Sequence, residues 1–296
     1  MKNLKNNKVF GLLTLLLIYI FAVAVGLLVF YLLKDHMHFL LAILIADVVS
    51  TVVVWASGIV AQTPSVYDPY WSIQTVIIYL PLLFYFNNWN MFTIIPLVVM
   101  LLYSIRLTVN FIKGFHGLAY VDWRYDMLKE KSGKLFQLVN LMGICMFPTL
   151  VVYSASIPLF IYAALPIDSY SYLDLIGSFV ILVGIYFELI ADLQMKAFIK
   201  IRKSRSDVID IGMWKYSRHP NYLGEILIWF GVAFILIIHN YQMAYWIAGA
   251  IINLLMFLFI SIPMEEKHML SYKPELKEYI KTTSCLLLLP KKKVKE

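Results

Sequence analysis

Long runs of apolar residues, separated by short polar segments, dominate the chain. The first run covers residues 9 to 33, and the second covers residues 39 to 61. A membrane-spanning helix needs roughly 17 to 25 such residues, so both runs are long enough to cross a bilayer. The further apolar runs lie at residues 71 to 86, 91 to 111, 137 to 165, 172 to 195, 222 to 238 and 244 to 262. The pattern predicts an all-α, polytopic transmembrane bundle of about eight helices, with seven as the lower count.

Two of these predicted helices differ from a straight crossing. The run at residues 71 to 86 is short for a bilayer, and the run at residues 137 to 165 is long and contains Pro148 and Pro158. Proline inside a helix removes a hydrogen bond and bends the axis. We therefore expect these two helices to be tilted, kinked or partly re-entrant.

The basic residues are distributed very unevenly between the loops. Of the 25 lysines and arginines, all except Lys34 lie in the N-terminal segment, between residues 106 and 134, between residues 196 and 221, or after Pro263. Cytoplasmic loops of membrane proteins carry such an excess. With eight crossings these segments all fall on one side, so both termini are predicted to be cytoplasmic.

The composition excludes several protein classes. The chain has 296 residues, of which 61% are hydrophobic and 15% charged, whereas a soluble domain is about half apolar and a quarter charged. A soluble enzyme, a disordered chain and a secreted disulfide scaffold are thereby excluded. Cys145 and Cys285 are far apart and lack metal-ligand spacing, so we expect free thiols and no metal site.

The net charge of +7 has a simple explanation in orientation and in attraction to anionic membrane lipids. That explanation covers the basic tail, which contains Lys291, Lys292, Lys293 and Lys295. The charge therefore predicts no nucleic-acid partner. Because no internal repeat or soluble segment is evident, residues 1 to 296 are expected to form a single integral membrane domain without an obligate protein partner.

Carboxylates within the apolar runs are functional candidates, because a charge in the hydrocarbon core costs several kcal/mol. Four qualify: Asp47, Glu188, Asp192 and Glu225. Glu188 and Asp192 are four residues apart, on one helix face that continues to Lys196 and Lys200. This stripe suits either a functional site or an ion-paired seam between helices. For Asp47 we expect a structural hydrogen bond to a neighbouring helix.

The densest polar segment runs from Gly212 to Glu225 and leads directly into an apolar helix. Arg218 and His219 offer hydrogen-bond donors, and Trp214 offers a stacking face. Pro220 or Asn221 begins the helix, and its free backbone N–H groups favour an anion. This composition suits a phosphate-bearing nucleotide, although aromatic and basic residues also serve as anchors at a membrane interface.

Two further polar clusters lie near predicted cytoplasmic ends. One combines Arg106 with the segment Asp122-Trp123-Arg124-Tyr125. The other follows Pro263 and contains Glu265-Glu266, and its His268 and Tyr272 fall on one helix face. We expect the second to close over a ligand held by the segment around Arg218. The alternative for each is a solvated amphipathic stretch.

These motifs together resemble one known family. The stretch from Asp192 through Arg218-His219-Pro220-Asn221-Tyr222 to Glu265-Glu266 resembles the C-terminal half of the steroid 5-alpha-reductase-like membrane enzymes, in their bacterial branch. The likeness extends upstream through Tyr103-Ser-Ile-Arg106 and Asp122-Trp123-Arg124-Tyr125. The superfamily also contains sterol reductases and isoprenylcysteine carboxyl methyltransferases, so the motif fixes the fold better than the cofactor.

The resemblance implies an NADPH-dependent reduction of a carbon-carbon double bond conjugated to a ketone. Tyr103 is then the catalytic donor to the substrate carbonyl, and Asp68 is the carboxylate that supports it. The implied cofactor-binding residues are Asp192, Lys196, Arg218, His219, Asn221, Tyr222, Glu225, Arg124, Trp214, His268 and Tyr272. Residues 61 to 134 would carry substrate and catalysis, and residues 186 to 290 would form the cofactor-binding half. A soluble-type dinucleotide fold is absent, because no Gly-x-Gly-x-x-Gly motif follows a strand.

The implied substrate is lipidic and enters from the bilayer, with 3-oxo-4-ene steroids as the best-known class and other enone lipids as alternatives. The resemblance also implies a bacterial inner membrane with the cofactor site facing the cytoplasm. A methyltransferase that uses S-adenosylmethionine is the competing enzyme class. A transporter or lipid-binding protein would explain the intramembrane acids, but it would leave the segment around Arg218 without a role.

Overall fold

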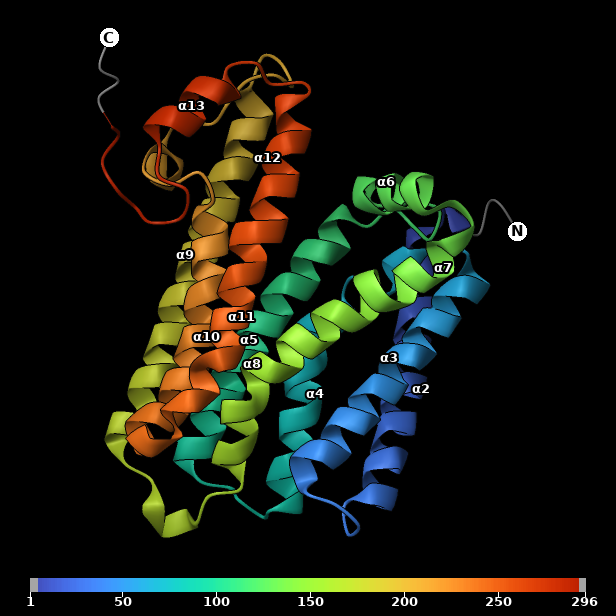
Figure 1. Cartoon of the computed structure of the whole chain (residues 1–296), viewed down its shortest axis with the longest axis vertical. Helices are drawn as coiled ribbons and strands as arrows, with labels where there is room; N and C mark the ends of the chain where they lie inside the picture. The colour runs from blue at the N-terminus through green and yellow to red at the C-terminus, as the bar shows by residue number, and fades with distance from the viewer. Residues whose placement is uncertain (1–4, 293–296) are drawn as a thin grey trace. The chain divides into compact units, whose positions relative to one another are not determined.

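The computed structural model describes residues 5–292, and the regular elements in that range are helices, apart from one isolated bridge between Ser217 and Ser284 (Figure 1). Seven helical stretches of the described chain are long and apolar enough to cross a membrane. They are Lys8–Leu33, Phe39–Ala61, Met91–Gly114, Trp123–Ala163, Tyr172–Ile201, Pro220–His239 and Tyr241–Leu270. The predicted all-α transmembrane bundle is confirmed, and the chain is an integral, multi-pass membrane protein.

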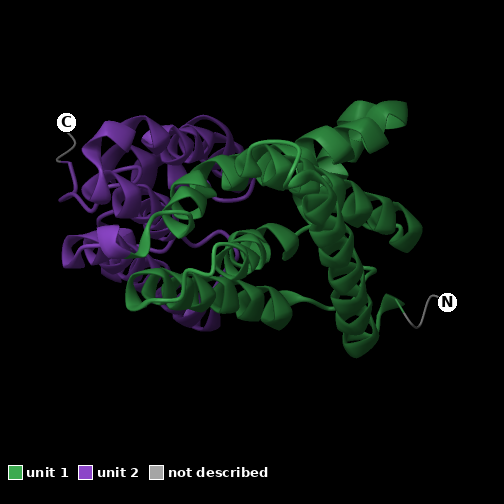
Figure 2. Ribbon diagram, turned by 90° about the horizontal axis from the view of Figure 1, so that it is seen from below, with its two compact units in different colours: residues 1–167 green, residues 168–296 purple. Residues whose placement is uncertain are grey.

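The chain divides into two units, Met1–Ile167 and Asp168–Glu296, which Figure 2 colours separately. The segment predicted for substrate and catalysis, residues 61 to 134, belongs to unit 1. The predicted cofactor-binding half, residues 186 to 290, belongs to unit 2.

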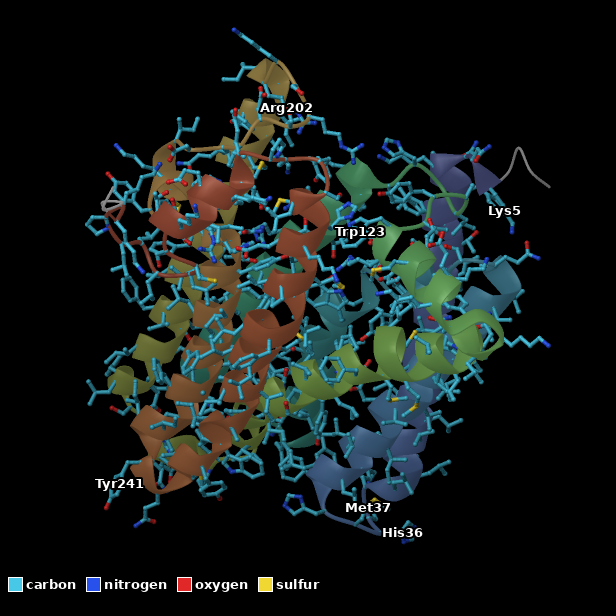
Figure 3. The ribbon with its side chains drawn as sticks, turned by 45° about the horizontal axis from the view of Figure 1, so that its top comes forward. Lys5, His36, Met37, Trp123, Arg202 and Tyr241 are labelled. Atoms are coloured by element: carbon cyan, nitrogen blue, oxygen red, sulfur yellow. The ribbon has the colours of Figure 1, made fainter. Side chains whose placement is uncertain are left out.

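Unit 1 contains α2 (Lys8–Leu33), α3 (Phe39–Ala61), α4 (Tyr70–Tyr85), α5 (Met91–Gly114), α6 (Trp123–Ser132), α7 (Phe136–Val139) and α8 (Phe147–Ala163). Its polar segments gather at one end. The ammonium of Lys5 donates to the carbonyl of Ala61 at 3.0 Å, and the backbone N–H of Ala119 donates to the carbonyl of Lys5 at 3.2 Å. His36 and Met37 lie at the opposite end from Lys5 and Trp123 (Figure 3).

Helix α4 is the short helix expected from residues 71 to 86. It begins at the end of unit 1 where Lys5 meets Ala61. It ends beside Asn88, whose side-chain amide donates to the carbonyl of Ala163 at 2.9 Å. With 16 residues and a rise of 1.5 Å each, α4 is about 24 Å long, less than the roughly 30 Å of a bilayer core. It is therefore not one of the seven stretches long enough to cross a membrane, which gives the described chain the lower of the two predicted counts.

The long helix predicted at residues 137 to 165 is distorted, as expected. Asn140–Met146 form a π-helix directly before α8, and Pro148 lies in the first turn of α8. A π-helical turn contains an extra residue and removes the regular hydrogen bonds that a proline would otherwise break. Pro158 lies inside α8 itself.

Unit 2 is built on two antiparallel helices, α9 (Leu175–Ile201) and α10 (Pro220–His239). Gly177 and Gly184 of α9 face Gly231 and Gly224 of α10. A Cβ built on Gly184 would lie 2.6 Å from the carbonyl oxygen of Gly224. The two backbones thus touch along a glycine stripe, a close packing that membrane helices use in place of hydrophobic association.

The remaining elements of unit 2 are η6 (Gly212–Lys215), η7 (Tyr241–Ile247), α11 (Ala248–Met256), the π-helix η8 (Phe257–Ser261), α12 (Ile262–Leu270) and α13 (Leu276–Thr282). Arg202 and Tyr241 mark opposite ends of this unit (Figure 3). After α13 the chain returns to the segment before α10, where the N–H of Arg218 donates to the carbonyl of Ser284 at 2.9 Å. Lys291 pairs with Asp210, whereas Lys293 and Lys295 lie outside the described residues.

Candidate functional site

The segment before α10 is held in a fixed turn by α9. Gly212 has φ +58°, in the left-handed region that glycine adopts without strain. The carbonyl oxygen of the Gln194 side chain accepts the N–H of Met213 at 2.9 Å. The indole N–H of Trp214 donates to the carbonyl of Ala191 at 3.1 Å, and its ring is buried against Ala191 and Ile209. In unit 2, Trp214 therefore packs the turn against α9, while its predicted contact with a cofactor stays a prediction.

Arg218, His219 and Glu266 form the central polar cluster of unit 2. One carboxylate oxygen of Glu266, on α12, lies 2.8 Å from Nε of Arg218 and 2.9 Å from Nε2 of His219. The Arg218 guanidinium also donates to the carbonyls of Ile280 and Thr283. All three side chains are largely buried. The cluster joins the start of α10 to α12 and to the end of α13.

The first turns of α10 present the other predicted residues. Pro220 begins the helix, as predicted, with Asn221 half-buried directly after it. The rings of His219 and Tyr222 are stacked, with centroids 5.2 Å apart and an interplanar angle of 9°. Glu225 is buried and accepts the indole N–H of Trp229 at 2.8 Å. These contacts give the start of α10 a fixed aromatic and acidic face.

A second group of unit 2 surrounds Tyr272. The ring of His268 meets Tyr272 edge to face with centroids 5.5 Å apart, so the predicted sharing of one face is confirmed. The guanidinium of Arg205 lies 5.0 Å from the Tyr272 ring centroid, and Nζ of Lys273 lies 6.0 Å from it. Burial lowers the pKa of Lys273, and the positive charges of Arg202 and Arg205 lower it further. The cations exceed their acidic neighbours here, which is the electrostatic setting of an anion site.

The stripe predicted on α9 lies within one continuous helix. Along it the side chains become progressively more exposed: Glu188 is buried, Asp192 is half-buried, and Lys196 and Lys200 are exposed. Glu188 packs along α10, because a Cβ on Gly224 would lie 2.5 Å from its Cγ. The order of burial matches a polar stripe that runs from the membrane interior to its surface.

Asp68, in the segment between α3 and α4, is a half-buried acid of unit 1. The hydroxyl of Tyr125, on α6, donates to Oδ1 of Asp68. Burial raises the pKa of Asp68 to about 6, although the Tyr125 hydrogen bond and the charge of Arg124 oppose that rise. The raised pKa makes Asp68 able to hold or release a proton near neutral pH.

The predicted catalytic Tyr103 lies on α5 and is 1% exposed. The phenol of Tyr125, which was not predicted, donates to Asp68, while the predicted pairing of Tyr103 with Asp68 stays a prediction. Arg124 binds Asp122, with Nε 2.8 Å from Oδ1 and Nη2 3.1 Å from Oδ2. This pair fixes the first turn of α6, and thereby the position of Tyr125.

Tyr125 also borders a polar cavity of about 200 Å³. The cavity is lined by side chains of α3, α6, α7 and the loops between them, among them Gln62, Lys129, Gln137 and Asn140. A cavity of this size and polarity has room for several ordered waters. Water there would connect the Tyr125 hydroxyl to the polar end of unit 1.

A family model described as "Protein of unknown function (DUF1295)" matches residues 54–283. The chain belongs to this family. The match begins within α3, so α2 and the first half of α3 precede it, whereas both polar clusters of unit 2 and the Asp68–Tyr125 pair lie inside it. Neither the curated proteins nor the solved structures that were compared contain a match to the chain.

Proposed function

We propose that this protein is an NADPH-dependent membrane oxidoreductase that reduces a carbon-carbon double bond conjugated to a ketone in a lipidic substrate. The substrate class proposed first is the 3-oxo-4-ene steroids, which makes the enzyme a 5-alpha-reductase type. The observation that carries the proposal is the hydrogen-bonded pair of the half-buried Asp68 and the buried Tyr125 in unit 1. The motif resemblance of the Arg218 segment supports it. We place the enzyme in a bacterial inner membrane with its cofactor side in the cytoplasm.

The chemistry requires a donor for the oxygen of the enone, because negative charge develops there when the double bond is reduced. A phenol in an apolar site stabilises that charge more strongly than water does, since the charge is poorly screened. Tyr103 is proposed as this donor. Asp68, with a pKa of about 6, is proposed to hold the proton that Tyr125 relays toward the polar cavity. NADPH would supply the hydride.

The cations of unit 2 fit a dinucleotide phosphate. Arg205 and Lys273 lie over the Tyr272 ring, and the charges of Arg202 and Arg205 lower the pKa of Lys273. A phosphate group would relieve that repulsion and stabilise the charged lysine. His268 and Tyr272 would border the same ligand, and Asp192, Asn221, Tyr222 and Glu225 are proposed for the nicotinamide and ribose. This chain thus offers both the charge and the aromatic surface that NADPH needs.

The first experiment is a thermal unfolding series of the detergent-purified protein with NADPH, NADH or S-adenosylmethionine. A ligand that binds only the folded state raises the melting temperature. We expect a shift with NADPH, loss of most of that shift in Lys273→Met, and no loss in the exposed control Lys277→Met. NADPH oxidation followed with a 3-oxo-4-ene steroid then tests the reaction. An absent NADPH shift would refute the proposal.

One observation favours the competing methyltransferase. The guanidinium of Arg218 is engaged by Glu266 and by two backbone carbonyls, so it has less capacity for a phosphate than the sequence suggests. S-adenosylmethionine contains no phosphate, and its single carboxylate needs fewer free cations than the phosphate groups of NADPH. Stabilisation by S-adenosylmethionine alone in the same unfolding series would move the assignment to methyl transfer, with the segment around Arg218 holding its carboxylate.

A further inference from the structure

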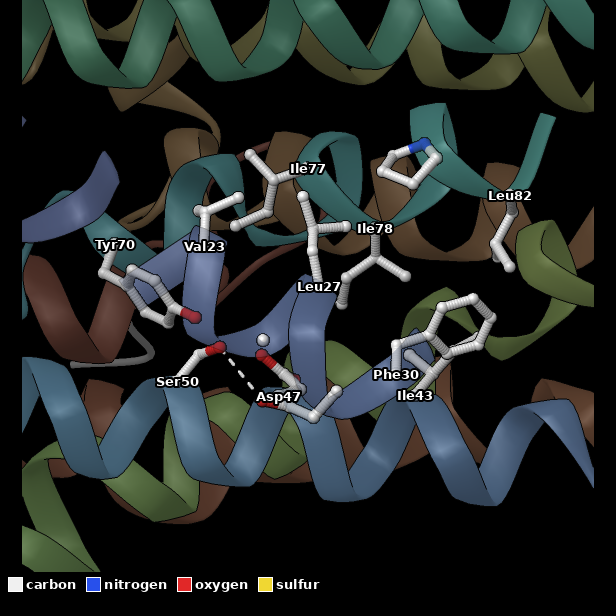
Figure 4. Close-up of a pocket in the computed structure, with 13 residues that line it drawn as sticks. Val23, Leu27, Phe30, Ile43, Asp47, Ser50, Tyr70, Ile77, Ile78 and Leu82 are labelled. Atoms are coloured by element: carbon white, nitrogen blue, oxygen red, sulfur yellow. Dashed lines mark hydrogen bonds between the residues drawn. The ribbon is translucent and has the colours of Figure 1, made fainter. Parts of the chain in front are cut away.

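The cavity in Figure 4 lies inside unit 1 between α2, α3 and α4, and has no part in the proposed reduction. Val23, Leu27 and Phe30 of α2 and Ile77, Ile78 and Pro81 of α4 form its apolar walls. Leu27 is 43% exposed, so the mouth of the cavity lies on the lipid-facing side of α2. Its polar part is formed by Asp47, Ser50 and Tyr70 (Figure 4).

Asp47 is tied to the core by one of its two oxygens. Its Oδ2 accepts the side-chain amide of Gln74 at 2.6 Å, and the same amide donates to the carbonyl of Thr149 at 3.0 Å. The predicted hydrogen bond to a neighbouring helix is thus confirmed. Within residues 5–292, Gln74 is the one hydrogen-bond partner of the Asp47 carboxyl, so Oδ1 is left to the cavity. A carboxyl buried to 4% exposure with an open oxygen is costly in a bilayer unless a ligand meets it.

The other two polar groups define what that ligand must offer. The Ser50 hydroxyl directs its proton at the carbonyls of Ala22 and Ala46, at 3.0 and 2.9 Å, so toward the cavity its oxygen can only accept. Tyr70 turns its hydroxyl toward Ser50 in Figure 4, so the phenol proton meets the Ser50 oxygen. The acceptor that remains open to the cavity is Oδ1 of Asp47, and a hydroxyl is the smallest neutral group that donates to it.

The volume defines the shape of the ligand. The cavity holds about 50 Å³, and one water needs about 10 to 15 Å³ of such space. Three or four heavy atoms therefore fit, which is enough for the end of a chain and too little for a fused ring system. The apolar mouth favours a hydrocarbon that continues into the bilayer.

We propose that this cavity binds the hydroxyl end of a linear lipid alcohol, of the fatty or isoprenoid kind. Asp47 and Ser50 precede residue 54, where the family match begins, whereas Tyr70 and the α4 wall lie inside the match. The cavity contains none of the residues assigned to the reductase, so the proposal does not depend on that assignment.

The test uses the full-length protein in detergent and a photoreactive probe, dodecan-1-ol with a diazirine on its chain. Mass spectrometry should locate the label on residues of α2 and α4 that line the cavity. Unlabelled dodecan-1-ol should compete about fivefold better than 1-methoxydodecane, which lacks the donor, because a net hydrogen bond is worth about that factor. Equal competition by the two compounds would overturn the proposal and leave a cavity that holds only water.

Two variants locate the binding. Leu27→Trp fills the mouth and should abolish specific labelling, whereas Leu28→Trp, one residue along the exposed face of α2, should leave it unchanged. Asp47→Ala should weaken labelling about fivefold. If Asp47→Ala does not fold, the comparison of Leu27→Trp with Leu28→Trp still tests whether the probe binds in the cavity. Unchanged labelling in Leu27→Trp would refute the site, and the NADPH unfolding series with the same variant reports separately on the proposed reductase.

Discussion

The protonation of Asp68 leads to a stability prediction that requires no knowledge of the substrate. The groups that act on Asp68 are the Tyr125 hydroxyl, Arg124, Asp122 and Ser65. Burial outweighs them and raises its pKa from 3.8 to about 6. A carboxyl with a raised pKa holds its proton more tightly in the folded protein than in the unfolded chain. Its stabilising contribution is complete below pH 3.8 and is lost as the pH rises through about 6.

The magnitude follows from the two pKa values. The shift of about two pKa units corresponds to about 3 kcal/mol between the ends of the pH range, at about 1.4 kcal/mol per unit. Asp68→Asn keeps the shape of the neutral carboxyl but does not titrate. The wild type should therefore lose up to about 3 kcal/mol relative to Asp68→Asn between pH 4 and pH 7, or about 5 °C in melting temperature for a chain of this size.

The assay is thermal unfolding of the wild type and Asp68→Asn in detergent at several pH values from 4 to 7.5, with the exposed Asp126→Asn as the matched control. As the pH rises, the melting temperature of Asp68→Asn should increase relative to that of the wild type, whereas the difference between Asp126→Asn and the wild type should stay constant. If the difference between Asp68→Asn and the wild type is constant, or if the wild type gains instead, Asp68 is ionised in the folded protein. The charge of Arg124 would then outweigh burial, contrary to the reasoning above.

Three further changes test other parts of the structure. Tyr103→Phe should reduce enone reduction by a hundredfold or more and leave the NADPH melting shift intact, as expected for a donor that acts on the transition state; unchanged turnover would eliminate Tyr103 as the donor. Gly224→Ala, whose Cβ would lie 2.6 Å from the carbonyl oxygen of Gly184, should destabilise the protein by about 1 to 3 kcal/mol. Thermal unfolding should show no such loss for Gly114→Ala, which meets open space. Glu266→Gln weakens the shared acceptor of the central cluster and should lower stability by about 1.5 to 3 kcal/mol in the same assay; a neutral result would mean that the cluster is not a clamp.

The helices could be predicted from the sequence because their signal is local. The run at residues 39 to 61 coincides with α3, Phe39–Ala61, and the short run at residues 71 to 86 becomes α4, Tyr70–Tyr85. Hydrocarbon length and the cost of an unpaired backbone group act on each segment separately, so a run of apolar residues is sufficient evidence. The glycine stripe of α9 and α10 was not predicted, although Gly177 and Gly184 have the same spacing as Gly224 and Gly231.

The partners within the candidate site depend on contacts between distant segments, and there the sequence was insufficient. The family resemblance pointed to Tyr103 as the phenol beside Asp68, and that contact stays a prediction, whereas the hydrogen bond from Tyr125 to Asp68 was not predicted. Tyr125 lies in the first turn of α6, so its contact with Asp68 depends on how α6 packs. The sequence singled out Glu266 as half of an acidic pair. It did not predict that one carboxylate oxygen of Glu266 contacts both Arg218 and His219, because that contact depends on how α12 packs against α10.

The cations around Tyr272, which we propose as a phosphate site, form a group that no sequence motif marks. Arg202, Arg205 and Lys273 come from two segments that are far apart in sequence, and Lys273 has no sequence feature that distinguishes it from other lysines. Folding brings them together at a cost, because a buried lysine near two arginines has a lowered pKa. Lys273 is buried, whereas Arg202 is half-buried and Arg205 is exposed, and Asp207 and Glu265 offset part of the positive charge. An anion that approaches from solvent would relieve the remaining repulsion on Lys273, which is the role proposed above for a phosphate group.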